Sequence, residues 1–291
     1  MNEIRTVGIA GSGTMGSGIA IVSARAGFST HVYDERPEAL DRARRQTDGF
    51  FAKSVERGKL SSEAAEAACA ALRHTTKIED LAECDLVTEA VFEDLAVKQA
   101  LFSRLDAICQ KRTIFASNTS TLSITEIASG CGREDRVVGM HYCLPAQLMR
   151  LVEMSAGLNT SEEAFGAAWD FCLACGQQPV RTKDTPGFIL NYFLVPYIND
   201  AIRLVEAGVA EPADIDRAVK KGLGHKMGPC ELLDLIGLDT LILLCEAFHA
   251  ATNDPRAACP PLVRRMVAAG HLGRKTGRGF YTYDSDAMFG G

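Results

Sequence analysis

Residues 6–20 decide the fold. The β-type run Thr6-Val7-Gly8-Ile9 leads into the glycine motif Gly11-Ser12-Gly13-Thr14-Met15-Gly16, which is followed by the helix-forming residues 17–20. A strand that turns through G-x-G-x-x-G into a helix is typical of a dinucleotide site, because the glycines let the backbone approach a pyrophosphate. The N-terminus of the helix offers unpaired N–H groups and a partial positive charge to the phosphates. Ordinary tight turns also use this spacing, so the motif needs a second signal.

The second signal is Asp34, which ends the β-type run 29–33 and follows Gly16 by 18 positions. An acidic side chain at this place accepts hydrogen bonds from the ribose 2′-hydroxyl and repels a 2′-phosphate. Arg36 is a counter-signal, because arginine is a good phosphate ligand. The balance favours NAD over NADP. The cofactor-binding residues predicted from this pattern are Gly11, Gly13, Thr14, Met15, Gly16 and Asp34.

The first part of the chain alternates short β-rich runs with helical patterns. The runs cover residues 6–9, 29–33, 85–90, 113–117, 137–141 and 151–154. Such alternation predicts an α/β fold with a doubly wound, mainly parallel sheet. A longer helical stretch at 37–72, interrupted near Gly58 and restarted by a capping signal at Ser61, predicts a helical insertion.

The pattern becomes almost wholly helical after the turn-forming residues 183–187. Helices are predicted at 188–207, 211–221, 231–250 and 261–269. We therefore expect an α/β domain at residues 1–184 and a smaller all-helical domain at 185–291, which suits a chain of 291 residues.

Composition limits the classes of function. A net charge of -6 disfavours nucleic acid as a partner, and no apolar run approaches bilayer length. The first residues lack the features of a secretory signal, so we expect a cytoplasmic protein without membrane contact. Ten scattered cysteines favour reduced thiols over disulfides. Cys172 and Cys175 have C-x-x-C spacing without a second pair or a nearby histidine, so no metal site is predicted.

His141 is the best candidate for a catalytic base. It ends the β-type run 137–141, and ligands of open α/β sheets bind at the carboxyl ends of the strands. Glu153 lies on the next run, and an antiparallel pairing of the two strands would bring its carboxylate to the imidazole. Such a pair fixes the tautomer and stabilises the imidazolium, as alcohol oxidation by a nicotinamide enzyme requires.

The chain resembles the L-3-hydroxyacyl-CoA dehydrogenase family over nearly its whole length. The similar stretches are 7–20, 85–93, 116–120, 139–141, 149–153, 184–188 with Asn191, 227–229 and 272–281. The resemblance implies a Rossmann-type domain, a helical domain that forms a homodimer, and a 3-hydroxyacyl thioester substrate that is oxidised with NAD.

Carried over by position, the resemblance makes His141 the base and Glu153 its partner. It assigns Ser117 and Asn191 to the reacting oxygen or the thioester carbonyl. It further places four residues at the cofactor, which are Glu93, Lys98, Ser117 and Lys275.

The sequence departs from the family pattern at two places. Leu144 stands where the family usually has asparagine, three positions after the base, and Phe50 falls at a serine used for CoA recognition. Arg57 takes the place of a lysine that contacts CoA. These departures make CoA itself less certain than a thioester.

An acyl carrier protein is therefore the alternative handle for a 3-hydroxyacyl group such as glyceryl or seryl. A basic stretch could grip either handle, and it comprises Arg42, Arg44, Arg45, Lys53, Arg57 and Lys59. A related class of β-hydroxyacid dehydrogenases uses a lysine on the interdomain helix, but residues 187–204 contain none. A non-catalytic NAD-binding protein is a further alternative, which the joint presence of His141, Glu153, Ser117 and Asn191 disfavours.

Overall fold

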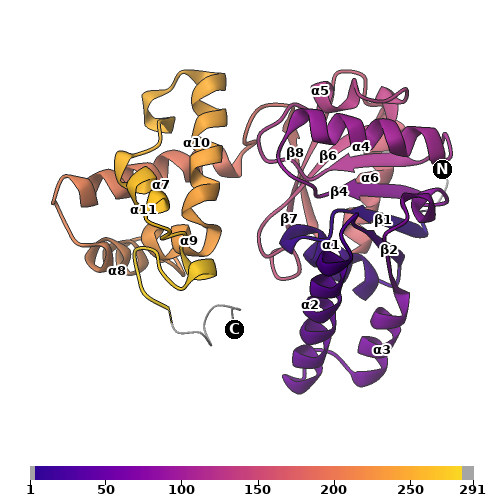
Figure 1. Ribbon diagram of the computed structural model, residues 1–291, viewed down its shortest axis with the longest axis horizontal. Coiled ribbons are helices and arrows are strands. Elements are labelled where there is room, and N and C mark those ends of the chain that lie inside the picture. Colours follow the sequence, from indigo (N-terminus) through magenta and orange to yellow (C-terminus); the bar gives the residue numbers. More distant parts are fainter. Residues whose placement is uncertain (1–3, 284–291) are drawn as a thin grey trace. The chain divides into compact units, whose positions relative to one another are not determined.

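The computed structural model describes residues 4–283 and divides into two compact units between Thr185 and Pro186. Figure 1 shows an α/β unit and a helical unit. The domain boundary expected after residue 184 lies one residue before this division.

The α/β unit is built on an eight-stranded sheet in the order β3-β2-β1-β4-β5-β6-β7-β8. Its strands are β1 (Thr6–Ala10), β2 (Ser29–Tyr33), β3 (Leu72–Thr75), β4 (Leu86–Glu89), β5 (Ile114–Ser117), β6 (Val137–Tyr142), β7 (Leu151–Ala156) and β8 (Gln178–Lys183). Neighbouring strands are parallel except β6 and β7. The predicted doubly wound, mainly parallel sheet is confirmed.

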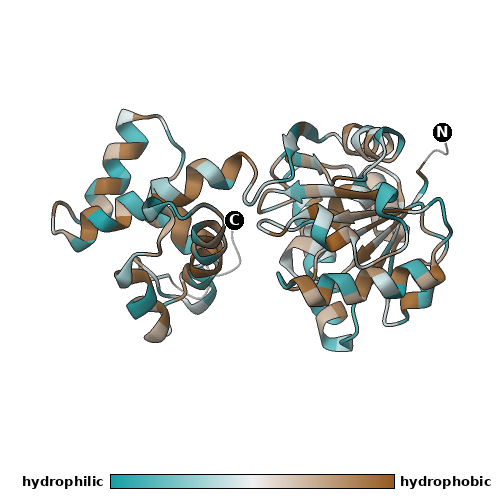
Figure 2. Ribbon diagram, turned by 90° about the horizontal axis from the view of Figure 1, so that it is seen from above, coloured by the Kyte–Doolittle hydropathy of each residue, from teal (hydrophilic) through white to brown (hydrophobic). Residues whose placement is uncertain are grey.

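Helices cover both faces of the sheet. On one face, α1 (Thr14–Arg25) and α6 (Glu162–Ala174) pack through side chains such as Ile19 and Phe165. On the other face, α4 (Leu95–Ile108) and α5 (Ile124–Ala128) contribute Phe102 and Ile127. The central strands are hydrophobic along much of their length (Figure 2), as expected of parallel strands buried on both faces. Two short 3-10 turns, Ile78–Leu81 and Glu134–Arg136, complete this unit.

The predicted insertion forms two helices, α2 (Pro37–Glu56) and α3 (Ser62–Ala71). Gly58 lies between them with a positive φ of 65°, and the Ser61 hydroxyl caps α3 by accepting a hydrogen bond from the Ala64 N–H at 3.2 Å. The expected helical stretch was wrong at its end, because Leu72 begins β3 rather than ending a helix.

The helical unit contains α7 (Leu190–Glu206), α8 (Pro212–Gly222), α9 (Pro229–Ile236), α10 (Leu238–Thr252) and α11 (Pro261–Ala268), with 3-10 turns at Pro255–Ala257 and Arg274–Thr276. Four of these helices, α7, α9, α10 and α11, share one hydrophobic core. The single helix predicted at 231–250 was wrong. Gly237 separates α9 from α10 with a φ of 105°, which side-chain-bearing residues rarely adopt. Between residues 4 and 283, no helix has the length and apolar character needed to cross a membrane.

Candidate active site

The glycine loop has the shape that a bound pyrophosphate requires. Gly11 has a φ of 101°, and a Cβ there would lie 2.7 Å from the Ala90 carbonyl oxygen. A Cβ at Gly16 would lie 1.8 Å from the Gly11 carbonyl oxygen, so the turn closes too tightly for any side chain. Gly13 is exposed, and nothing lies within 4 Å of its Cβ position. The loop therefore packs closely on the protein at Gly11 and Gly16 and is open to solvent at Gly13. Helix α1 begins on this open side with Thr14 and Met15.

Asp34 stands at the end of β2 beside this loop. Its Oδ2 accepts hydrogen bonds from the Ser12 N–H at 3.0 Å and the Ser12 hydroxyl at 2.9 Å. Its Oδ1 accepts the Arg36 N–H at 3.1 Å and keeps a lone pair for a further donor. Burial by itself would raise the pKa of Asp34, but the hydrogen bonds from Ser12 and Arg36 outweigh it and lower the pKa. The charged carboxylate suits a ribose hydroxyl and opposes a phosphate.

Arg36 lies beside Asp34 and the exposed Phe92, and its own side chain is 60% exposed. Its Nε lies 3.5 Å from Asp34 Oδ1, and its guanidinium lies 6.0 Å from the centre of the exposed Phe92 ring. Its charge is directed toward the carboxylate that would repel the phosphate.

His141 and Glu153 form a buried pair at the carboxyl end of the sheet. They face each other in the antiparallel register of β6 and β7. Glu153 Oε2 lies 2.9 Å from His141 Nδ1, and both side chains are more than 90% buried. The carboxylate fixes the proton on Nδ1 and leaves Nε2 as the acceptor. Nε2 lies 3.0 Å from the hydroxyl oxygen of Ser120.

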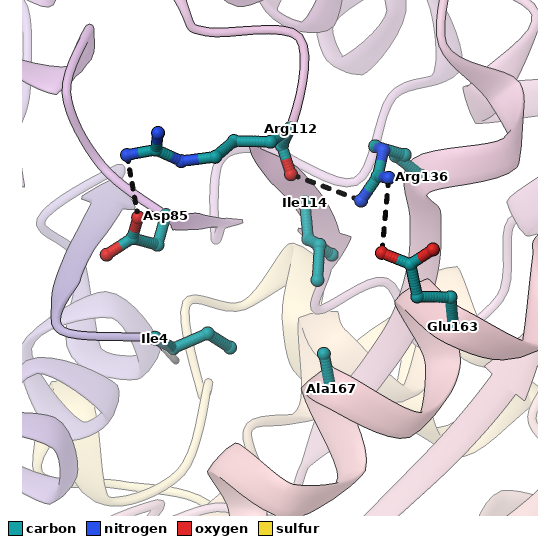
Figure 3. A pocket seen from close by; sticks show the side chains of 7 residues that line it. All are labelled: Ile4, Asp85, Arg112, Ile114, Arg136, Glu163 and Ala167. Atoms are coloured by element: carbon teal, nitrogen blue, oxygen red, sulfur yellow. Dashed lines mark hydrogen bonds and ion pairs between the residues drawn. The ribbon is translucent and has the colours of Figure 1, made fainter. Parts of the chain in front are cut away.

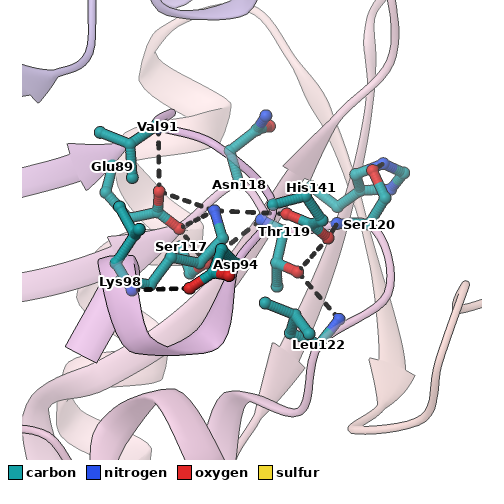
Figure 4. A network of polar contacts seen from close by, with 12 residues as sticks. Glu89, Val91, Asp94, Lys98, Ser117, Asn118, Thr119, Ser120, Leu122 and His141 are labelled. Atoms are coloured by element: carbon teal, nitrogen blue, oxygen red, sulfur yellow. Dashed lines mark hydrogen bonds and ion pairs between the residues drawn. The ribbon is translucent and has the colours of Figure 1, made fainter. Parts of the chain in front are cut away.

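Ser120 lies in the loop after β5, next to His141 (Figure 4), and Glu93 holds this loop in place. Glu93 Oε1 accepts hydrogen bonds from the backbone N–H groups of Ser120 and Thr121 at 2.8 and 2.9 Å. It also accepts the hydroxyls of Thr119 and Thr121 at 2.6 and 3.0 Å. Burial would raise the pKa of Glu93, but the charge of Lys98 and these donors outweigh it and lower the pKa. Glu93 therefore links the loop after β4 to the loop that contacts His141.

Ser117 and Lys98, which the resemblance places at the cofactor, are buried and paired within the protein, so their expected roles stay predictions. Ser117 is fully buried at the end of β5, where its hydroxyl donates to Glu89. Lys98 is 1% exposed, and its Nζ lies 2.7 Å and 3.3 Å from carboxylate oxygens of Glu89 and Glu93. Both side chains are thus directed at the carboxylates of the protein itself. The serine that contacts His141 is Ser120, which lies just past the strand end in the same sequence motif.

The loop that follows β6 is seated on the helix of the glycine motif. A Cβ at Gly18 would lie 2.7 Å from Gln147 Oε1 and 3.1 Å from Ala146 Cβ. The cofactor helix and the loop after His141 therefore pack directly together. Leu144 in this loop is 38% exposed.

Phe50 belongs to the packing of the helical insertion. It packs edge to face on Phe51, with ring centroids 5.6 Å apart, and joins the small core between α2 and α3. Arg57 is exposed just beyond the end of α2.

Asn191 and Lys275 belong to the helical unit. Asn191 is buried in the first turn of α7, where its N–H donates to the Gly187 carbonyl at 3.1 Å. Lys275 is paired with Asp239 at 2.6 Å.

A hollow of about 230 Å³ in the α/β unit contains none of the predicted site residues (Figure 3). Its lining residues are Ile4, Asp85, Arg112, Ile114, Arg136, Glu163 and Ala167. Asp85 and Arg136 directly precede β4 and β6, and Ile4 lies two positions before β1, so the hollow lies at the amino edge of the sheet, away from His141. Arg112 contacts Asp85 and Arg136 contacts Glu163, both at 3.4 Å.

The C-x-x-C pair lies at the end of α6 and is buried. All ten cysteines are free thiols. Burial raises the pKa of Cys175 to about 12 and that of Cys172 higher still, so both stay protonated at neutral pH.

A dinucleotide loop followed by an acidic strand end, with a buried His–Glu pair at the same edge of the sheet, defines a nicotinamide-dependent dehydrogenase. Comparison with known families specifies the class. Residues 6–185 match the 3-hydroxyacyl-CoA dehydrogenase, NAD binding domain, and residues 187–283 match the 3-hydroxyacyl-CoA dehydrogenase, C-terminal domain. The chain belongs to the 3-hydroxyacyl-CoA dehydrogenase family, and the prediction of NAD as its cofactor is confirmed.

Individual relatives match over nearly the whole chain. The probable 3-hydroxybutyryl-CoA dehydrogenase of Deinococcus radiodurans is 42% identical over 95% of this chain and 99% of its own length. The mitochondrial hydroxyacyl-coenzyme A dehydrogenase of Rattus norvegicus is 41% identical over 96% of this chain and 91% of its own. The crystal structure of M. tuberculosis FadB2 superposes with a TM-score of 0.95 at 42% identity, covering 97% of this chain and all of that one.

Proposed function

We propose that the chain interconverts 3-hydroxyacyl-CoA and 3-oxoacyl-CoA with NAD. The observation that carries this proposal is the buried His141–Glu153 pair, in which Nε2 of His141 lies 3.0 Å from the Ser120 hydroxyl and the loop after His141 packs on the dinucleotide helix. The relatives from D. radiodurans and R. norvegicus, a probable 3-hydroxybutyryl-CoA dehydrogenase and a hydroxyacyl-coenzyme A dehydrogenase, support the acyl-CoA substrate.

The proton chemistry falls to His141. In the oxidative direction Nε2 takes the proton of the 3-hydroxyl while a hydride leaves the carbon that carries this hydroxyl. Glu153 accepts the Nδ1 proton at 2.9 Å and stabilises the imidazolium that results. In the reverse direction the imidazolium returns its proton to the 3-oxo oxygen. The Ser120 hydroxyl, which lies 3.0 Å from Nε2, can donate a hydrogen bond to the charge that develops on that oxygen.

The chain's residues fit NAD. When bound, NAD supplies the acceptor or donor of the hydride. The open face of Gly13 and the N-terminus of α1 would take the pyrophosphate, and the remaining acceptor of Asp34 would take a ribose hydroxyl. We also propose that Asn191 binds the substrate and that Lys275 binds the cofactor. The family resemblance is the basis for both roles.

We further propose a homodimer formed through the helical unit. This unit exposes large apolar side chains, among them Tyr192, Phe193, Leu223 and Leu243. Exposed apolar groups of this size favour a protein partner, and a second copy is the one that the resemblance implies. Analytical ultracentrifugation tests it. The ten free thiols favour a reducing compartment such as the cytoplasm.

The exposed basic residues of the α2 region are proposed to meet the phosphates of CoA. Arg42, Arg45 and Arg57 are all exposed along or just beyond this helix. The same charges suit an acidic carrier protein, so the test compares the two handles.

The experiment follows NADH absorbance with acetoacetyl groups carried on CoA or on acyl carrier protein. We expect kcat/KM on acetoacetyl-CoA within about 10⁴ to 10⁸ M⁻¹s⁻¹, little affected by moderate salt. Activity confined to the carrier-bound substrate, weakened steeply by salt, would reject CoA as the handle. Binding of NADH without its consumption on either substrate would reject the dehydrogenase.

A further inference from the structure

A second buried carboxylate, Glu89, lies behind the loop that contacts His141 (Figure 4). It ends β4 and is completely shielded from solvent. Its Oε1 accepts hydrogen bonds from Lys98 Nζ at 2.7 Å and from the Ser117 hydroxyl. Its Oε2 accepts Lys98 Nζ at 2.8 Å and the Val91 N–H at 3.1 Å. A carboxylate offers about four lone-pair positions, so Glu89 is fully satisfied and has no capacity left for a ligand.

The partners of Glu89 lead to the base by two routes. Lys98 also contacts Glu93 Oε2 at 3.3 Å, and Glu93 holds the N–H of Ser120. The Ser117 hydroxyl accepts the N–H of Thr119, the neighbour of Ser120, at 3.2 Å. Both routes end at the Ser120 hydroxyl, which lies 3.0 Å from His141 Nε2.

We propose that Glu89 is a positioning residue for hydride transfer, which acts through Lys98 and Ser117 to hold the Ser120 hydroxyl against His141. The inference deepens the proposed function and rests on it.

A contribution to fold stability does not by itself explain why Glu89 and Lys98 form a buried ion pair. A buried ion pair costs desolvation energy that well-packed apolar side chains of the same volume would avoid. Lys98 also stands between two carboxylates that would otherwise repel each other across the loop. What the arrangement delivers is a fixed geometry at the loop, and displacement of a reacting group by about 1 Å can cost on the order of 100-fold in rate.

The test substitution is Glu89→Gln, which keeps the shape and removes the charge. The amide oxygen can still accept a hydrogen bond, but the amide nitrogen would face the donors Val91 N–H or Lys98 Nζ. Lys98 loses half of its contacts to Glu89, and the loop held by Glu93 is released from its position.

The matched control is Asp106→Asn, on the same helix α4. Asp106 pairs at 2.6 Å with Arg133, which is 97% buried, so this substitution also breaks a buried ion pair. The pair joins α4 to the segment after α5, and its hydrogen bonds are made with Gly132 and with the backbone of Asp106 and Cys109, outside the site. Both variants should lose thermal stability, so stability does not separate the two roles.

Two readouts separate them. At saturating acetoacetyl-CoA and NADH, kcat of Glu89→Gln should fall about 10- to 100-fold, with a smaller change in KM, while Asp106→Asn keeps the wild-type kcat. In histidine-labelled protein, the ¹⁵N resonance of His141 Nε2 reports its hydrogen bond. The Ser120→Ala variant gives the chemical shift of this resonance without the hydrogen bond. In Glu89→Gln the chemical shift should change toward that value, and in Asp106→Asn it should stay at the wild-type value.

A wild-type kcat and a wild-type Nε2 resonance in folded Glu89→Gln would overturn the proposal. If that variant does not fold, Ser117→Ala takes its place, because it removes the second route with little change in volume. Its kcat should fall and its resonance should shift in the same direction, and wild-type values for both would overturn the proposal. If the wild-type protein consumes no NADH with acetoacetyl-CoA, the proposed function fails, whereas the resonance comparison still decides the positioning.

Discussion

Replacing Glu153 by glutamine tests the contact on which the proposed chemistry depends most. The substitution keeps a hydrogen-bond acceptor near His141 Nδ1, 2.9 Å away in the native protein, but removes the negative charge from a site whose side chain is 1% exposed. A hydrogen bond to a charged group contributes about 1.5–3 kcal/mol. The imidazolium develops only as the proton is transferred, so this loss falls on the transition state. At 1.36 kcal/mol per factor of ten, kcat should drop about 10- to 150-fold.

The assay is the oxidation of 3-hydroxybutyryl-CoA, together with NADH binding measured by fluorescence. Binding should stay within about twofold of wild type, because Glu153 lies on β7, which is separated from β1 and its glycine loop by β4, β5 and β6 in the sheet. Glu162→Gln is the control, since it removes a carboxylate from the exposed pair with Arg181 and should leave kcat unchanged. A wild-type kcat in Glu153→Gln would refute the role of the carboxylate.

Three further substitutions address the other parts of the site. His141→Gln should lower kcat at least about 100-fold with NADH binding retained, and stopped-flow turnover at the native rate would remove His141 from the mechanism. Asp34→Ala should weaken the preference for NAD over NADP, measured as a ratio of kcat/KM values, because it removes both the ribose acceptor and the charge that opposes a phosphate; an unchanged ratio would contradict this. The lowered pKa of Glu93 means that its carboxylate stabilises the fold above about pH 4.3, and this contribution is lost as the pH falls through the folded-state pKa. Glu93→Gln should therefore reduce the free energy of unfolding in urea more at about pH 7 than at about pH 3, and an equal loss at both would show that the charge has no part in it.

The fold was predictable where the sequence pattern was local. Glycine spacing, β-rich runs and the Ser61 cap gave six of the strands and the interruption of the insertion. β3 was missed because its residues 72–75 continue a helical run without a break in polarity, and only pairing with β2 makes them a strand. Gly237 was missed as a helix break for a similar reason, since a single glycine within an apolar pattern does not reveal its φ.

The sequence predicted which residue types form the site, but not which of their side chains are buried behind it. The antiparallel pairing that brings Glu153 to His141 followed from two neighbouring β-rich runs. The choice between Ser117 and Ser120 did not, because it depends on where β5 ends. Ser117 is the last residue of that strand and points inward, whereas Ser120 lies three positions later in the loop. Glu89 carried no signal of its own, since it reads as the end of a hydrophobic strand until Lys98 is seen buried against it.

The close packing of Gln147 and Ala146 on Gly18 limits which substitutions the sequence can accept during evolution. The dinucleotide fingerprint ends at Gly16, so Gly18 would pass as an ordinary helical position. A methyl group there would require the end of the Gln147 side chain to move and Ala146 to shift slightly, and a larger residue would require a larger displacement of this loop. Substitutions at residue 18 should therefore co-vary across homologues with those in the loop after His141, although the two segments are more than 120 positions apart in the chain. The module that binds the cofactor and the module that carries the base are then inherited as one unit, and a chimaera that exchanges only one of them should misplace the other.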